Sequence, residues 1–216
     1  MRIVFDLDGT LIDSAPDIAH AANAVLQSEG LPPVTLEQTR SFVGNGARVF
    51  VERLERASAG GNAPDRTARM RARFITEYER AHGHTAIYPG VEAAIATLRA
   101  QGWRIGLCTN KPMVPTRAVL AHFGWSDLFE TVLGGDSLPQ MKPDPAPLHA
   151  VLETLGDGPA LYVGDSEVDA LTAQAADVPF ALFTEGYRKT GLDAIPHAEA
   201  FADWSALPAI AARLIA

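Results

Sequence analysis

Two aspartates near the N-terminus, Asp6 and Asp8, are the residues best suited to chemistry in this chain. They follow the apolar run Ile3 to Phe5, which is typical of a fully buried strand, and Gly9 comes directly after them. Because side chains alternate along a strand, both carboxylates are expected to point the same way. Two neighbouring anions at the end of a buried strand need a bound cation or a shared proton. With a divalent ion present, one carboxylate can act as a nucleophile while the other transfers a proton.

This short pattern is not specific by itself, because D-x-D-G also occurs in ordinary turns and in calcium-binding loops. Support has to come from the elements that position the two carboxylates. Short apolar segments predict further strands at residues 103–109, 131–133, 160–164 and 179–183. Helical patterns lie around and between them, at 91–101, 116–123, 145–155 and 167–176. This alternation predicts an α/β fold with a parallel sheet covered on both faces.

Polar residues stand directly after the predicted strands. In sheets of this kind, ligands bind beyond the carboxyl ends of the strands, so these residues are expected to meet at one rim. The set consists of Asp6 and Asp8, Thr109 to Lys111, Gly135 and Asp136, Gly164 to Ser166, and Thr184 and Glu185.

Residues 14–84 contain helical patterns and no strand signal. Helices are predicted from Pro16 to Gly30, from the capping-box pair Thr35 and Gln38, after the break at residues 44–46, and from Pro64. We therefore predict two domains, a core of residues 1–13 and 85–216 and an inserted helical cap of residues 14–84. The cap leaves the chain just after the first aspartates, so it should act as a lid over the rim, hinged near residues 13–17 and 82–89.

The composition limits the possible partners. A net charge of −8 and a pI near 5.2 argue against a nucleic-acid surface or an anionic membrane. We find no run of 18 apolar residues and no basic leader, which predicts a cytoplasmic protein. A monomer or a homodimer is expected. The single cysteine, Cys108, excludes an internal disulfide, and the six histidines are too scattered to indicate a site.

Four motifs in order resemble the haloacid dehalogenase superfamily: Asp6-Leu7-Asp8-Gly9-Thr10, Thr109 at a strand end, Lys142-Pro143-Asp144-Pro145, and Gly164-Asp165-Ser166-Glu167-Val168-Asp169. The resemblance covers nearly the whole chain. It implies a three-layer Rossmann-like core with a helical insertion similar to the C1-type cap of that superfamily. The segments at 13–17, 88–90, 109–111 and 186–187 further resemble its phosphoglycolate phosphatase branch.

The resemblance implies a Mg²⁺-dependent phosphate-monoester hydrolase with a small phosphorylated substrate, most simply 2-phosphoglycolate. In that scheme Asp6 is the nucleophile and Asp8 the acid and base. The ion would be held by Asp6, the backbone carbonyl of Asp8 and Asp165, with Asp169 acting through water. Phosphate would be bound by Thr109, Asn110 and Lys142. In isolation, Asp165 could equally cap a helix, Lys142 could lie on the surface and Thr109 could simply end a strand.

Substrate choice is expected to come from the cap. The loop Gly44-Asn45-Gly46 precedes a helix, and Asn45, Gly46 and Arg48 are predicted to accept a small carboxylate, although a plain glycine-rich helix break would explain the same residues. Several alternatives share the four motifs: a sugar-phosphate mutase similar to β-phosphoglucomutase, a nucleotidase, a pyrophosphatase, and an inactive binding protein on the same fold. The intact Asp6, Asp8, Thr109, Lys142 and Asp165 count against the inactive protein.

Overall fold

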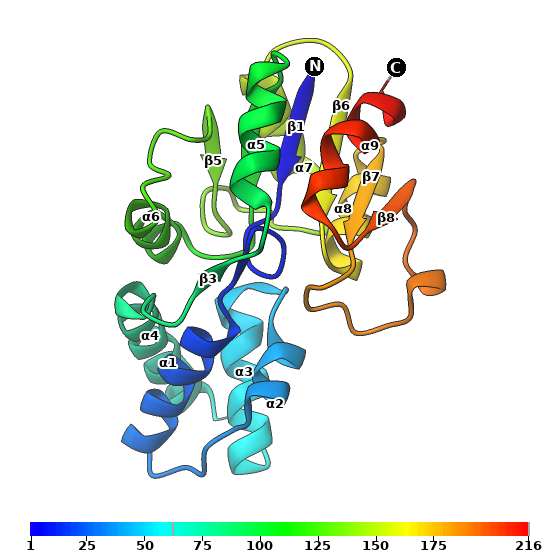
Figure 1. The fold of residues 1–216 in the computed structure, drawn as a ribbon. Helices are drawn as coiled ribbons and strands as arrows, with labels where there is room; N and C mark the ends of the chain where they lie inside the picture. Colours follow the sequence, from blue (N-terminus) through cyan, green and yellow to red (C-terminus); the bar gives the residue numbers. More distant parts are fainter. Residues whose placement is uncertain (62, 216) are drawn as a thin grey trace.

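The computed structural model describes residues 1–61 and 63–215. Within them, parallel strands form a six-stranded sheet in the order β5-β4-β1-β6-β7-β8 (Figure 1). The strands are β1 (Arg2–Phe5), β4 (Arg104–Cys108), β5 (Thr131–Leu133), β6 (Ala160–Gly164), β7 (Phe180–Phe183) and β8 (Glu199–Phe201). In the register of the sheet, Phe5 at the end of β1 is paired with Leu107 of β4 and Val163 of β6. The residues that follow these strands therefore lie side by side.

The central strands are buried on both faces, which explains their nearly continuous apolar sequence. In β1, Ile3 and Phe5 belong to one hydrophobic cluster and Val4 to the cluster on the other face. The first cluster is covered by α5 (Val91–Ala100), α6 (Met113–His122) and α9 (Leu207–Leu214), and the second by α7 (Ala146–Thr154) and α8 (Glu167–Ala175). Short 3₁₀ turns occur at Leu192–Ala194 and Trp204–Ala206. This three-layer arrangement confirms the predicted α/β class.

The segment after β1 forms α1 (Ala15–Ser28), α2 (Leu36–Phe42), α3 (Gly46–Ala59) and α4 (Pro64–Arg80). These helices have a hydrophobic cluster of their own, which includes Ile18, Leu26, Phe50, Leu54 and Phe74. Figure 1 shows them grouped beyond the carboxyl edge of the sheet. The chain enters and leaves this group through β2 (Ile12–Asp13) and β3 (Ala86–Ile87), which pair antiparallel. The predicted domain limits at residues 14 and 84 fall beside this ribbon.

Some helices and strands were not predicted from the sequence. The edge strand β8, the ribbon of β2 and β3, and α9 were not predicted. The strands among these are only two or three residues long, too short to show a two-residue period. Helix α6 begins at Met113, three residues before the predicted start, and includes Pro115. Proline is tolerated there because the first-turn N–H groups have no helical partner. None of the helices in the described ranges combines the length and hydropathy needed to span a bilayer.

Candidate active site

The site lies at the carboxyl ends of the three central strands. Asp6 follows β1, Thr109 follows β4 and Asp165 follows β6, and all three side chains are buried and line one pocket. One carboxylate oxygen each from Asp6, Asp165 and Asp169 lie within 4.8 Å of one another. The structure thus brings together acidic residues that are about 160 positions apart in sequence, as the strand-end pattern predicted.

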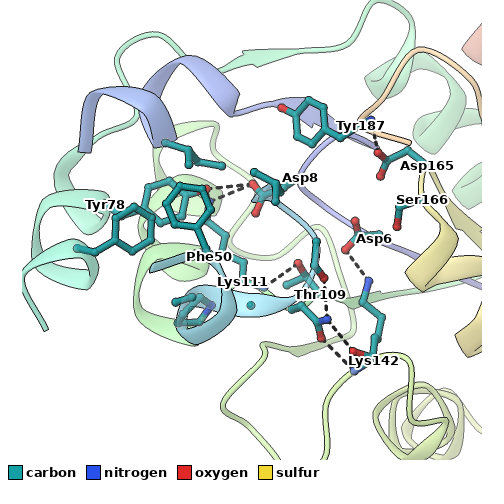
Figure 2. Close-up of a pocket in the computed structure, with 18 residues that line it drawn as sticks. Asp6, Asp8, Phe50, Tyr78, Thr109, Lys111, Lys142, Asp165, Ser166 and Tyr187 are labelled. Carbon is teal, nitrogen blue, oxygen red and sulfur yellow. Dashed lines mark hydrogen bonds and ion pairs between the residues drawn. The ribbon is translucent and has the colours of Figure 1, made fainter. Parts of the chain in front are cut away.

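Lys142 supplies a buried positive charge to this acidic group. Its Nζ donates to Asp6 Oδ1 at 2.8 Å, a contact drawn in Figure 2. It also donates to Asp169 Oδ1 at 2.6 Å and to the Tyr162 hydroxyl at 2.8 Å. These three bonds use all the N–H groups of the ammonium. Burial lowers the pKa of Lys142, but the charges of Asp169 and Asp6 outweigh burial and hold that pKa above its ordinary value. Lys142 is therefore charged at any physiological pH.

A single ammonium does not neutralise three buried carboxylates. Burial raises the pKa of Asp6 to about 7, even though Lys142 acts in the opposite direction. Burial, with the charges of Asp169 and Asp6, likewise raises the pKa of Asp165 well above its usual range. Buried carboxylates in excess repel one another, and a hard divalent cation, which prefers oxygen ligands, would reduce that repulsion. The donor set therefore fits a metal ion.

Asp165 is held rigidly by the segments on either side of it. Oδ1 accepts a hydrogen bond from the Thr10 hydroxyl at 2.8 Å, and Oδ2 accepts one from the Tyr187 backbone N–H at 2.5 Å. Gly9 has a φ of +90°, and a Cβ at this position would lie 2.5 Å from Asp165 Oδ2. Only glycine therefore lets the loop after β1 turn against this carboxylate.

Asp8 faces the helical segment and has different partners. Its Oδ1 accepts hydrogen bonds from the Ser14 hydroxyl at 2.6 Å, Lys111 Nζ at 3.0 Å and the Tyr78 hydroxyl at 3.3 Å. Figure 2 shows Asp8 on the side of Tyr78 and Phe50, whereas Asp6 lies beside Lys142. No hydrogen bond to Oδ2 of Asp6 or Asp8 is found among the described residues, so each carboxylate presents one oxygen for chemistry.

Thr109 and Asn110 both line the pocket, but they differ in the use of their side chains. Thr109 Oγ1 accepts from the Lys111 backbone N–H at 3.2 Å, so its own hydroxyl hydrogen remains available for a phosphoryl oxygen. The Asn110 amide donates to the backbone carbonyls of Gly44 and Lys142, both at 2.9 Å, and accepts from the Lys142 N–H at 3.0 Å. Asn110 thus joins the loop before α3 to the loop that carries Lys142.

The three predicted cap residues do not lie together. Gly46 lines the pocket, whereas Asn45 and Arg48 do not. Gly46 has a φ of +76°, and a Cβ there would lie 2.7 Å from Met141 Cε, so glycine allows α3 to start close to the core.

The prediction that Arg48 faces the pocket is wrong. Arg48 is exposed, pairs with Glu52 at 2.7 Å and lies over a separate surface groove near Arg71. The reason is helical rotation of about 100° per residue, because Ala47 and Phe50 share the pocket face of α3 and Arg48 is turned away from it.

Three pocket residues, Lys111, Tyr78 and Tyr187, were not predicted as site residues, and neither was Ser14, which donates to Asp8. Lys111 was recognisable only as a polar residue after a strand. Tyr78 lies on the apolar face of α4, where the centroid of its ring is 5.4 Å from that of Phe74, and nothing in the sequence indicates what its hydroxyl contacts.

Comparison with known proteins assigns the family. The family model for haloacid dehalogenase-like hydrolases matches residues 3–183. The chain is 52% identical over 217 aligned residues to a phosphoglycolate phosphatase of Cereibacter sphaeroides (strain ATCC 17029 / ATH 2.4.9), with 99% of both chains covered. It is 47% identical to a phosphoglycolate phosphatase of Rhodobacter capsulatus, covering 96% of this chain and 95% of the relative.

The fold agrees with this assignment. The crystal structure of a predicted phosphoglycolate phosphatase from Haemophilus somnus 129pt superposes with a TM-score of 0.91 at 32% identity, covering 97% of this chain and 96% of the other. Sequence motifs, sheet topology and full-length similarity all agree, and the chain therefore belongs to the haloacid dehalogenase-like hydrolases.

Proposed function

We propose that this protein is a phosphate-monoester hydrolase that converts 2-phosphoglycolate to glycolate and phosphate through an aspartyl-phosphate on Asp6. The observation that carries the proposal is the pair of carboxylates with separate surroundings: Asp6 beside Lys142 and the acidic group, and Asp8 beside Ser14, Lys111 and Tyr78. The relatives at 52% and 47% identity that are named phosphoglycolate phosphatases support the choice of substrate.

In the first half-reaction, Asp6 Oδ2 attacks phosphorus in line and the bond from phosphorus to the ester oxygen breaks. Asp8 donates a proton to the departing oxygen through Oδ2, since its Oδ1 is already occupied by three donors. Lys142 keeps Asp6 oriented and opposes the negative charge that develops at phosphorus. Thr109 donates its hydroxyl hydrogen to a phosphoryl oxygen.

In the second half-reaction, Asp8 takes a proton from a water molecule, which attacks the phosphorus of the aspartyl-phosphate. The bond between phosphorus and Asp6 breaks, which releases inorganic phosphate and restores the carboxylate. One residue thus acts first as acid and then as base, and the spacing of Asp6 and Asp8 in the loop after β1 supports both steps.

We propose that Mg²⁺ is held by the carboxylates of Asp6 and Asp165 and by the backbone carbonyl of Asp8, with Asp169 in an outer position. Asp169 is assigned to the outer position because its carboxylate oxygens already accept hydrogen bonds from Lys142, Tyr162 and Ser166. When bound, the ion would supply positive charge for the phosphoryl oxygens and for Asp6.

We further propose that residues 14–84 form a cap domain over a core of residues 1–13 and 85–216, with substrate enclosed between them. The pocket wall from the helical segment is mostly apolar, formed by Ile18, Val43, Ala47, Phe50 and Phe74. Such a wall provides few hydrogen-bond partners for the hydroxyl groups of a sugar, and it suits a compact substrate. A cytoplasmic location and a monomeric or homodimeric state belong to the same proposal and can be tested by cell fractionation and light scattering.

A panel of phosphate esters tests the proposed function. We expect phosphate release from 2-phosphoglycolate with a kcat/KM at least about tenfold above that for p-nitrophenyl phosphate, β-glucose 1-phosphate or nucleoside monophosphates, because a compact pocket favours a small acid. EDTA should abolish release and Mg²⁺ should restore it. Conversion of β-glucose 1-phosphate to glucose 6-phosphate without free phosphate would instead identify a mutase.

Metal binding should depend on pH. A carboxyl group whose pKa is raised on folding stabilises the fold below its unfolded pKa, and this contribution is lost as the pH rises through the folded pKa. With the pKa of Asp6 at about 7 in the metal-free protein, stability without metal should fall between about pH 4 and pH 7.

Because Mg²⁺ must displace this proton, the rise in Tm caused by saturating Mg²⁺ should be larger at pH 8 than at pH 6. Differential scanning calorimetry with and without the ion measures the rise, and Ca²⁺ serves as a second oxygen-preferring cation. Equal Tm increases at both pH values would contradict the linkage.

A further inference from the structure

We propose that Lys111 binds the carboxylate of the substrate and thereby fixes the specificity of the enzyme for small phosphorylated acids. The inference rests on the proposed phosphatase function and replaces Arg48, which the structure turns away from the pocket. It assigns to a core residue the role that sequence reasoning had placed in the cap.

The position of Lys111 in the pocket supports this role. It lies two residues after Thr109 and lines the same pocket as Asp6 and Asp8, with only 2% of its side chain exposed. Its backbone is fixed, because its N–H donates to Thr109 Oγ1 at 3.2 Å and its carbonyl accepts from the Gly135 N–H at 2.8 Å. The ammonium is therefore presented from a rigid loop.

Lys111 also has a hydrogen-bond donor to spare. Lys111 Nζ donates to Asp8 Oδ1 at 3.0 Å and to the Tyr78 hydroxyl, and it lies 3.7 Å from the centre of the Tyr78 ring. An ammonium has three N–H groups, so one remains without an acceptor among the described residues. Lys142 has none to spare, since Asp6, Asp169 and Tyr162 accept all three.

The distribution of positive charge in the pocket also supports this role. Lys111 and Lys142 are the two basic side chains that line the pocket within the described residues. Lys142 lies at the phosphoryl end beside Asp6, and the wall next to Tyr78 consists of Phe50, Phe74 and Ile18. A carboxylate placed against that wall would be buried without a partner unless Lys111 binds it.

The contact between Lys111 and Asp8 also bears on the length of the substrate. Asp8 must reach the leaving oxygen, and Lys111 Nζ lies 3.0 Å from Asp8 Oδ1. The anionic group that Lys111 binds therefore lies on the same side of the pocket as the leaving oxygen. This suits a phosphate ester on the carbon next to a carboxylate.

Two substrates of similar size test this inference. 2-Phosphoglycolate carries the carboxylate, whereas 2-hydroxyethyl phosphate keeps the two-carbon ester and replaces the carboxylate by a neutral group. For the Lys111→Met variant, the ratio of kcat/KM values for the two substrates should fall by about 10- to 100-fold, the range for loss of a charge-assisted hydrogen bond. Any effect of Lys111 through Asp8 alone lowers both values together and leaves the ratio unchanged.

The matched control is Arg48→Met, which removes an exposed positive charge outside the pocket and should leave the ratio within about twofold of the wild type. If Lys111→Met does not fold, Lys111→Gln keeps the polar contacts but loses the charge, and the same fall in the ratio is expected. A ratio within twofold of the wild type in a folded Lys111 variant overturns the inference while leaving the phosphatase proposal intact. A wild-type protein that hydrolyses neither ester overturns both.

Discussion

Replacement of Asp6 with asparagine is expected to lower kcat for 2-phosphoglycolate by about 10⁴-fold or more, because an amide cannot form the aspartyl-phosphate and the remaining groups cannot replace it. The variant should still fold. Lys142 keeps Asp169 and Tyr162 as acceptors, and the carbonyl oxygen of asparagine can still accept from it. The removed carboxyl group has a pKa of about 7 in the metal-free protein, so the buried charge that disappears was only partly present.

Steady-state phosphate release and urea denaturation measure these two effects separately. The matched control is Asp127→Asn, an exposed aspartate in the connection that precedes β5, at the edge of the sheet opposite to the site. It should leave both activity and stability nearly unchanged. Retention of more than about one hundredth of the activity by Asp6→Asn, in a preparation free of wild-type enzyme, would contradict nucleophilic catalysis by this residue.

Replacement of Lys142 with methionine is expected to impair both activity and stability. Methionine fills a similar volume, but it leaves Asp6 and Asp169 buried without their common cation and leaves the Tyr162 hydroxyl without its donor. Breaking a buried ion pair on one side costs about 3–5 kcal/mol of unfolding free energy, and protonation of the carboxylates limits the loss in this site. Loss of charge at the phosphoryl end should reduce kcat by about 10³-fold.

The pH dependence of this effect has a definite sign. The pKa values of Asp6 and Asp165 are already raised, and removal of the ammonium raises them further. The destabilisation of Lys142→Met relative to the wild type should therefore be larger at pH 8 than at pH 6, as measured by urea denaturation in EDTA. Lys189→Met is the matched control, since Lys189 is exposed and its Nζ donates to a backbone carbonyl, that of Val43, rather than to a buried carboxylate. An equal loss of stability in both variants would show that the buried charge is not the cause.

The position of the site could be predicted from sequence because it depends on local patterns. A buried parallel strand is recognisable as a short apolar run, and its carboxyl end is the residue where the run stops. Asp6, Thr109 and Asp165 each stand at such a stop, and the pairing of Phe5 with Leu107 and Val163 makes them neighbours. Lys142 lies in a loop without such a signal, and only its resemblance to a family motif indicated a role.

The short strands that were not predicted depend on long-range pairing rather than on a local pattern. Strand β8 and the ribbon of β2 and β3 are stabilised by pairing with distant segments, such as Ala181 with Glu199 and Ile12 with Ile87. Their own residues do not show the alternation that a half-buried strand produces. These strands form only where a distant segment is already in place to pair with them, so the local sequence could not predict them.

By itself, the amino-acid sequence determined the α/β class, the helical insertion after the first strand, and the carboxylates that must meet at the rim, since two- and 3.6-residue periods record which faces are buried. Only the tertiary structure decided which residues of the helical segment and of the loop after β4 reach those carboxylates. Arg48 turns away while Tyr78 and Lys111, 33 positions apart, close on Asp8. Such contacts depend on the rotation of each helix and on its distance from the core, and both are set by packing between segments far apart in the chain.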